Sequence, residues 1–133
     1  MKNPVIRLLA ACLTVSLVSG CSLYSINSGS LLGINVQDLE KARDNGLTKT
    51  VSLDYSAAFD KVTGILENKG LTIYQSDRKK QYIVTMGFPK QTDTTRVGIF
   101  FDRLPDGGTK ITLSSLSSTA LEKARTDIFG ELD

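Results

Sequence analysis

The chain has 133 residues and a formal net charge of +2, which fit one small domain and give no reason to expect a nucleic-acid partner. Hydrophobic residues make up 41% of the chain, enough for a modest core. The sequence contains two cysteines and no histidine, which excludes Ser-His and Cys-His nucleophiles and histidine-ligated metal sites.

The N-terminal segment has the pattern of a secretory signal peptide. Lys2 and Arg7 supply a short positive region, and the following segment Leu8–Val18, LLAACLTVSLV, carries no charge. This apolar stretch has the length of a signal-peptide core and is too short to span a bilayer as a helix. The sequence therefore predicts that residues 1–20 are removed on export.

The end of this segment resembles the signal box of bacterial lipoproteins. Residues 17–21 read LVSGC, an aliphatic residue and two small residues before a cysteine. The resemblance implies that the Cys21 thiol is joined to a diacylglycerol and that cleavage falls between Gly20 and Cys21. The new amino group would then receive an acyl chain. We expect no cofactor besides this covalent lipid.

Three alternatives to lipidation at Cys21 follow from the same segment. Cys12 also follows a matching box, but only four uncharged residues separate it from Arg7, too few for an apolar core. An ordinary signal peptide cut after Gly20 would leave a free thiol. An uncleaved anchor is the third alternative.

Removal of the signal changes what the composition implies. The full chain has 16 basic and 14 acidic residues, and because Lys2 and Arg7 leave, the mature chain has 14 of each. The mature chain also has no free thiol and no disulfide, since Cys12 is removed and Cys21 carries the lipid. Catalysis would depend on carboxylates or lysines alone, and we expect a protein that is not an enzyme.

Residues 21–47 are expected to form a lipidated tether. The segment after the cysteine, SLYSINSGSLLGI, is rich in Ser, Asn and Gly, a composition typical of a linker. A short helix is predicted over residues 35–46. Asp38 lies early in it, Lys41 lies late, and Gly46 occupies the C-terminal position that favours glycine.

Residues 48–133 are expected to form an α+β domain. Val51 and Leu53 alternate with polar residues as in a strand. A helix with an apolar stripe then runs from Ala57 to Gly70. Four strands over 71–75, 81–88, 96–103 and 109–116 and a closing helix over 119–132 follow.

The predicted architecture has two layers, a mainly antiparallel sheet packed on two helices, in the order β-α-β-β-β-β-α. Alternation along the strands indicates that one face of the sheet is covered. In the strand over 81–88, Tyr82, Val84, Met86 and Phe88 are expected on one face. The aromatic side chains are expected to pack in the core, with Phe100 as the exception, and a groove for an acyl chain or peptide is the alternative: Tyr74, Tyr82, Phe88, Phe100 and Phe101.

A candidate partner surface combines a basic turn with an aromatic side chain. Arg78, Lys79 and Lys80 form a charge run between two predicted strands. Phe100 falls on the face opposite to its two apolar neighbours, which predicts that it is exposed. For the basic run, a solvated hairpin turn is the alternative.

Metal and nucleophile sites are not expected. Asp93, Asp102 and Asp106 lack the spacing of a calcium loop, and a turn favours aspartate in any case. The serine-rich segment 114–118 has neither a histidine nor a Ser-x-x-Lys motif to activate a hydroxyl, so helix capping explains it better.

Residues 59–77, FDKVTGILENKGLTIYQSD, resemble the opening of a helix-grip domain of BamC, a lipoprotein of the outer-membrane protein assembly machine. There too a helix ends in a glycine or asparagine turn and leads into a strand, and a closing helix takes the place of residues 121–132. The resemblance covers residues 48–132 and implies a small outer-membrane lipoprotein with a single BamC-like domain. The chain lacks the second domain and the long N-terminal partner-binding segment of BamC.

These observations predict a membrane-anchored envelope lipoprotein that acts as a non-enzymatic interaction or scaffold module, in outer-membrane assembly or maintenance. Its expected partners are the membrane, through the lipid, and another envelope protein, with no nucleic acid and no metal. The alternative is a periplasmic carrier holding a lipid or other apolar ligand between sheet and helix, which requires a large cavity. Ser22 is not the aspartate that retains lipoproteins in the inner membrane, which implies a periplasm-facing outer-membrane location, or the cell membrane if the organism has only one.

Overall fold

The computed structural model describes residues 35–88 and 95–133. The elements in chain order are α1 (Val36–Lys41), the 3-10 helix η2 (Ala42–Asn45), β1 (Leu47–Val51), α2 (Tyr55–Asn68), β2 (Thr72–Asp77), β3 (Tyr82–Met86), β4 (Val97–Arg103), β5 (Thr109–Ser114), α3 (Ser118–Ala124) and the π-helix η3 (Arg125–Phe129). The expected signal peptide, Gly20 and Cys21 lie outside these residues. None of the described helices has both the length and the hydropathy needed to cross a bilayer.

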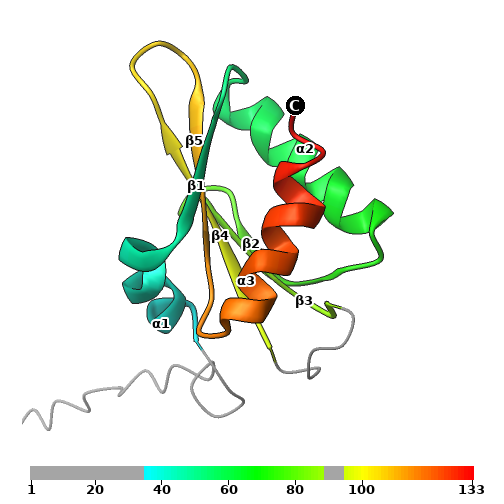
Figure 1. The fold of residues 1–133 in the computed structure, drawn as a ribbon. Coiled ribbons are helices and arrows are strands. Elements are labelled where there is room, and N and C mark those ends of the chain that lie inside the picture. The colour runs from blue at the N-terminus through cyan, green and yellow to red at the C-terminus, as the bar shows by residue number, and fades with distance from the viewer. Residues whose placement is uncertain (1–34, 89–94) are drawn as a thin grey trace, which may run out of the picture.

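The five strands form one antiparallel sheet in the order β1-β5-β4-β3-β2 (Figure 1). Helices α2 and α3 lie on one side of this sheet, and α1 lies on the other (Figure 1). The predicted α+β class is confirmed, as is the order of the five strands and the two main helices.

Helix α2 forms where its local sequence favours it. The Asp54 carboxylate accepts a hydrogen bond from the Ala57 N–H at 3.1 Å and so caps the first turn. Gly70, with a φ of +68°, follows the C-terminal end, where the left-handed conformation costs glycine little. The buried side chains follow helical spacing and face the sheet: Ala58, Phe59, Val62, Ile65 and Leu66.

The main core lies between the sheet and the pair α2 and α3. Alternate residues of the central strands point into it, and its fully buried members include Ile83, Val97, Ile99, Phe101, Ile111 and Leu113 from the sheet and Val62, Leu66 and Ile128 from the helices. Closing helix α3 begins after Ser117, whose hydroxyl accepts a hydrogen bond from the Ala120 N–H. The Lys49 ammonium of β1 donates to the Phe129 carbonyl at 2.8 Å, which ties the end of η3 to the sheet.

The second face of the sheet is also covered in part, over β3 and β4, and the expectation of a single covered face is wrong. Leu39 of α1 is fully buried against Phe100, Tyr82 and Val84. A Cβ atom at Gly98 would lie 2.6 Å from the Phe100 ring, so a glycine there leaves room for that ring beneath α1. Because α1 packs on the sheet, the packed domain includes α1, which lies within the segment expected to be tether.

Strand β3 divides its side chains between the two faces. Tyr82 and Val84 contact the α1 side, whereas Ile83 lies in the main core. Phe88 also lies in the main core, so the prediction that it shares a face with Tyr82 and Val84 is wrong. The reason is Gly87, whose φ of +89° interrupts the strand alternation just before Phe88.

Candidate functional site

Phe100 does not form a partner surface, and the expectation that it is exposed is wrong. Only 2% of its surface is accessible, because α1 and η2 lie over it. The Arg43 guanidinium stacks on the ring, with Cζ 4.7 Å from the centroid, and an ion pair with Asp102 at 2.8 Å holds this arginine. A partner could contact Phe100 only if α1 left the sheet.

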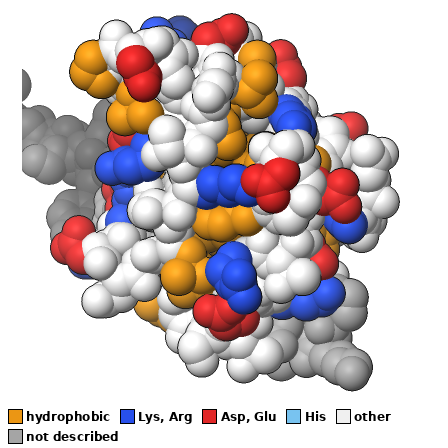
Figure 2. Space-filling model, turned by 45° about the horizontal axis from the view of Figure 1, so that its top comes forward, with side chains coloured by type: hydrophobic (Ala, Val, Ile, Leu, Met, Phe, Trp, Pro, Cys, Tyr) orange, Lys and Arg blue, Asp and Glu red, His pale blue; other side chains and the backbone are white. Residues whose placement is uncertain are grey.

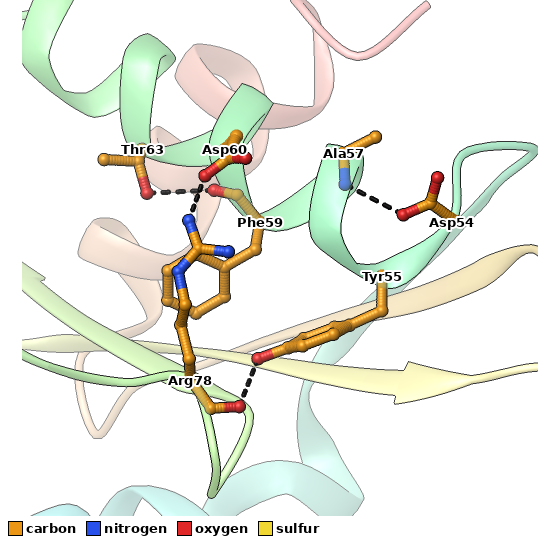
Figure 3. Close-up of polar contacts among 7 residues, drawn as sticks. All are labelled: Asp54, Tyr55, Ala57, Phe59, Asp60, Thr63 and Arg78. Carbon is orange, nitrogen blue, oxygen red and sulfur yellow. Dashed lines mark hydrogen bonds and ion pairs between the residues drawn. The ribbon is translucent and has the colours of Figure 1, made fainter.

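Arg78 joins the β2–β3 turn to α2 (Figure 3). Its guanidinium lies over the Phe59 ring, 4.4 Å from the centroid, and pairs with the Asp60 carboxylate. Its backbone carbonyl accepts a hydrogen bond from the Tyr55 hydroxyl. These contacts come from the first two turns of α2, so Arg78 has a structural role.

The aromatic side chains beneath Arg78 form a compact group. The rings of Tyr55, Phe59 and Phe101 lie 5.1 to 6.0 Å apart between centroids. Arg103 covers the Tyr55 ring from another side, 4.6 Å from its centroid. Burial raises the pKa of the Tyr55 hydroxyl, and the nearby cations of Arg78 and Arg103 oppose that shift.

Lys79 and Lys80 complete the turn but differ in their surroundings. Both backbone N–H groups donate to the Asp77 carboxylate at 2.9 Å, an Asx-type turn that explains the sequence of this segment. Both side chains are exposed. Lys80 lines a cavity beside α1, whereas Lys79 is not among its lining residues.

This cavity, which we name the α1 pocket, has a volume of about 210 Å³. It lies between α1 and the β2–β3 part of the sheet. Its lining residues are Asn35, Val36, Gln37 and Glu40 at α1, Tyr74 and Gln75 of β2, Lys80 of the turn, Tyr82 and Val84 of β3, and Arg96 just before β4. Most of these side chains are polar, which favours a polar ligand over an apolar one.

Two aromatic residues position the polar groups of the α1 pocket. Arg96 is 5% exposed, and its Cζ lies 3.8 Å from the centroid of the Tyr74 ring, which fixes the guanidinium plane. The Gln75 amide donates to the Tyr82 hydroxyl at 2.8 Å, so that hydroxyl keeps its own proton for donation. Burial raises the pKa of Tyr82, and the charges of Asp77 and Glu40 add to the shift. Tyr82 is therefore a neutral hydrogen-bond donor at physiological pH.

Sequence reasoning identified Lys80, and it assigned Tyr74 and Tyr82 to the core or to an apolar groove. It missed Arg96 and Glu40, and it did not predict that these groups share one polar site. Arg96 lies at the start of a strand, where an arginine gives no signal of burial. Glu40 lies on a helix that was assigned to the tether. Only the docking of α1 on the sheet brings these groups together.

The other candidate residues have structural partners. In the described part of the chain, no group of three or more His, Cys, Asp or Glu side chains is placed to hold a metal ion, and Asp93 lies outside that part. Asp102 pairs with Arg43 and Lys110, and Asp106 accepts a hydrogen bond from the N–H of its hairpin turn at Gly108.

The serine hydroxyls of 114–118 also serve the fold. Ser114 donates to the Leu39 carbonyl at 2.7 Å, a contact that attaches α1 to the sheet. Ser115 donates to the Arg96 carbonyl at 2.8 Å, which fixes the backbone at the α1 pocket. Helix capping is confirmed for Ser117, whereas Ser114 and Ser115 bind backbone carbonyls outside α3.

Comparison with known proteins gives no match: no protein-family model fits the chain, and no curated protein is significantly similar to it. The similarity to BamC domains stays a prediction, and the chain's own residues carry the functional argument.

Proposed function

We propose that this chain is a bacterial envelope lipoprotein whose α+β domain acts as a non-enzymatic interaction module in outer-membrane assembly or maintenance. The observation that carries the proposal is the sequence LVSGC at residues 17–21, directly after an uncharged apolar segment of signal-peptide length. Ser22 supports an outer-membrane address, and the likeness of residues 48–132 to a BamC helix-grip domain supports an envelope partner.

The anchor would keep the domain close to the membrane. Each buried acyl methylene contributes about 0.8 kcal/mol of membrane binding, so two or three chains make a stable anchor. Even a fully extended segment from Cys21 to Asn35 reaches at most about 50 Å, at roughly 3.3–3.6 Å per residue. Confinement to this layer raises the effective concentration of the domain for a membrane partner.

The surface charge supports a module that recognises a defined feature rather than a general anionic surface. Acidic and basic side chains are interspersed over the face shown in Figure 2. The mature chain would carry 14 residues of each sign. Without a field of one sign, long-range attraction to anionic lipid is weak, so recognition depends on a local site such as the α1 pocket.

The packing favours the module over a carrier of apolar ligands. The carrier hypothesis places its ligand between sheet and helices, where Val62, Leu66, Ile99 and Ile111 are fully buried against one another. An acyl chain there would have to displace close-packed side chains. The α1 pocket lies on the other face and is lined mainly by polar groups.

The proposal is tested by comparing Cys21→Ala with Cys12→Ala in the native envelope. We expect Cys21→Ala to abolish incorporation of a labelled fatty acid and to release the protein from the membrane fraction. Cys12→Ala leaves both unchanged, because Cys12 is removed with the signal. Retention of label and membrane association by Cys21→Ala contradicts the proposal.

The interaction role has its own test. Crosslinking of the intact lipoprotein in its envelope, followed by mass spectrometry, is expected to capture the same envelope protein in repeated preparations. Failure to capture any protein reproducibly, together with co-purification of an apolar ligand, contradicts the module and supports the carrier.

A further inference from the structure

The α1 pocket combines groups of both charges within one small cavity. Arg96 and Lys80 supply two cations, and Glu40 supplies one carboxylate. Among residues 35–88 and 95–133, neither Lys80 nor Glu40 takes part in an ion pair. Both charges are therefore available to a ligand.

The strand register explains how the two cations reach one cavity from opposite directions. Lys80 comes just before β3 and Arg96 just before β4, and these strands run antiparallel with Tyr82 opposite Phe100 and Thr85 opposite Val97. The two cations therefore enter from opposite ends of the strand pair. Glu40 approaches from α1, above the sheet.

The cations suit a phosphate group. Lys80 can form charge-assisted hydrogen bonds with phosphate oxygens, and Arg96, stacked on Tyr74, adds positive charge to the wall of the pocket. The Tyr82 hydroxyl, which accepts from Gln75, adds a neutral donor. The Glu40 carboxylate suits an ammonium group at the other end of the same ligand.

We propose that the α1 pocket binds a zwitterionic head group that joins a phosphodiester to a primary ammonium, as in phosphoethanolamine. The phosphate lies on Lys80 and the Tyr82 hydroxyl, within the positive field of Arg96, and the ammonium lies on Glu40. The volume of about 210 Å³ is large enough for a small polar group, and phosphoethanolamine has about eight non-hydrogen atoms.

The position of the pocket favours a membrane lipid as the source of this group. Asn35, which caps α1 and lines the pocket, is where the described domain begins, 14 positions after Cys21. This inference rests on the proposed anchoring for its lipid source, whereas the recognition chemistry depends only on the pocket. Bound head groups would set the orientation of the domain on the membrane surface.

The test uses the complete mature chain with Cys21→Ala, so that the anchor does not contribute to binding. The soluble probes are glycerophosphoethanolamine and glycerophosphoglycerol, which share the phosphodiester and differ in the ammonium. The lipid arm uses phosphatidylcholine vesicles that contain either phosphatidylethanolamine or phosphatidylglycerol. Calorimetry measures the soluble probes, and co-sedimentation measures the vesicles.

Two variants and two matched controls separate the roles. Lys80→Gln should weaken binding of both soluble probes about tenfold, the loss expected for one charge-assisted hydrogen bond. Glu40→Gln should remove the preference for the ethanolamine probe and leave the glycerol probe unchanged. Lys79→Gln, in the same turn, and Asp44→Asn, in η2, should change neither, because neither residue lines the pocket.

Binding of the soluble ethanolamine probe and of the matching vesicles supports a lipid source, and binding of the soluble probe alone supports a free phosphodiester. The proposal is overturned if neither probe binds, or if Lys79→Gln weakens binding as much as Lys80→Gln. It is also overturned if no probe binds and Lys80→Gln abolishes crosslinking to an envelope protein. That result would identify the α1 pocket as a protein-docking site. Failure in any of these ways leaves the Cys21 test unaffected.

Discussion

Leu39→Ala tests whether α1 is part of the folded domain. The Leu39 side chain of α1 is fully buried against Phe100. Full burial of a leucine side chain contributes about 1.5–3 kcal/mol to the unfolding free energy. Truncation also leaves a cavity, so the expected loss of unfolding free energy is about 2–5 kcal/mol. In a domain of this size each kcal/mol lowers Tm by roughly 4–8 °C.

Urea denaturation followed by far-UV circular dichroism measures this loss in the mature chain. Gln37→Ala is the matched control, because Gln37 lies on the same helix and is exposed. Its effect should stay within about 0.5 kcal/mol. A change of similar size for Leu39→Ala would mean that α1 does not pack on the sheet, and it would refute both the covered second face and the α1 pocket.

Three further predictions concern other contacts. Lys49→Met should lower the unfolding free energy by about 1–2 kcal/mol, because it leaves the η3 carbonyl without its charged donor; an unchanged urea midpoint would contradict that role. Arg78→Met should lower the unfolding free energy by about 1 kcal/mol, because it removes the contacts with the Phe59 ring and the Asp60 carboxylate. Lys79→Met should leave the unfolding free energy nearly unchanged, and equal losses for the two variants would refute a structural role specific to Arg78. Tyr55 and Tyr82 have raised pKa values in the folded protein. Their contribution to the unfolding free energy is therefore fully present below the unfolded pKa of about 10, and it is lost as the pH rises through the folded pKa values. Ultraviolet titration of the folded protein should show a tyrosine phase at higher pH than in the denatured chain, and the Tyr55→Phe and Tyr82→Phe variants should each reduce that phase. A folded protein that titrates identically to the denatured chain would contradict the assignment.

The main elements could be predicted because their signals are local. The stripe of α2 follows helical spacing, and Asp54 and Gly70 mark its ends in the sequence. Strand alternation and a Pro-Asp-Gly-Gly turn gave the β4–β5 hairpin. In each case neighbouring residues in the chain determine the structure.

The second face of the sheet could not be predicted because its signals are tertiary. Helix α1 has six residues and one fully buried side chain, Leu39, which makes no amphipathic pattern. The need for Gly98 beneath it becomes clear only when Phe100 and Leu39 are placed together. The alternation of side chains along β4 predicted that Phe100 faces solvent. That prediction failed because α1, which was assigned to the tether, packs over this face of the sheet.

The same limit applies to the candidate site. The sequence showed Lys80 as part of the basic run Arg78–Lys80, but only Lys80 of these three residues lines the α1 pocket. Arg78 lies over Phe59, and Lys79 does not line the pocket. A run of like charges therefore predicted the turn correctly but could not predict which cation lines the pocket.

The mass of the intact protein extracted from native membranes tests the central claim most directly. The account predicts a chain that begins at Cys21 and carries the added mass of a diacylglycerol and an N-linked acyl group. A chain that begins at Cys21 with an unmodified thiol, or one that retains residues 1–20, would contradict it.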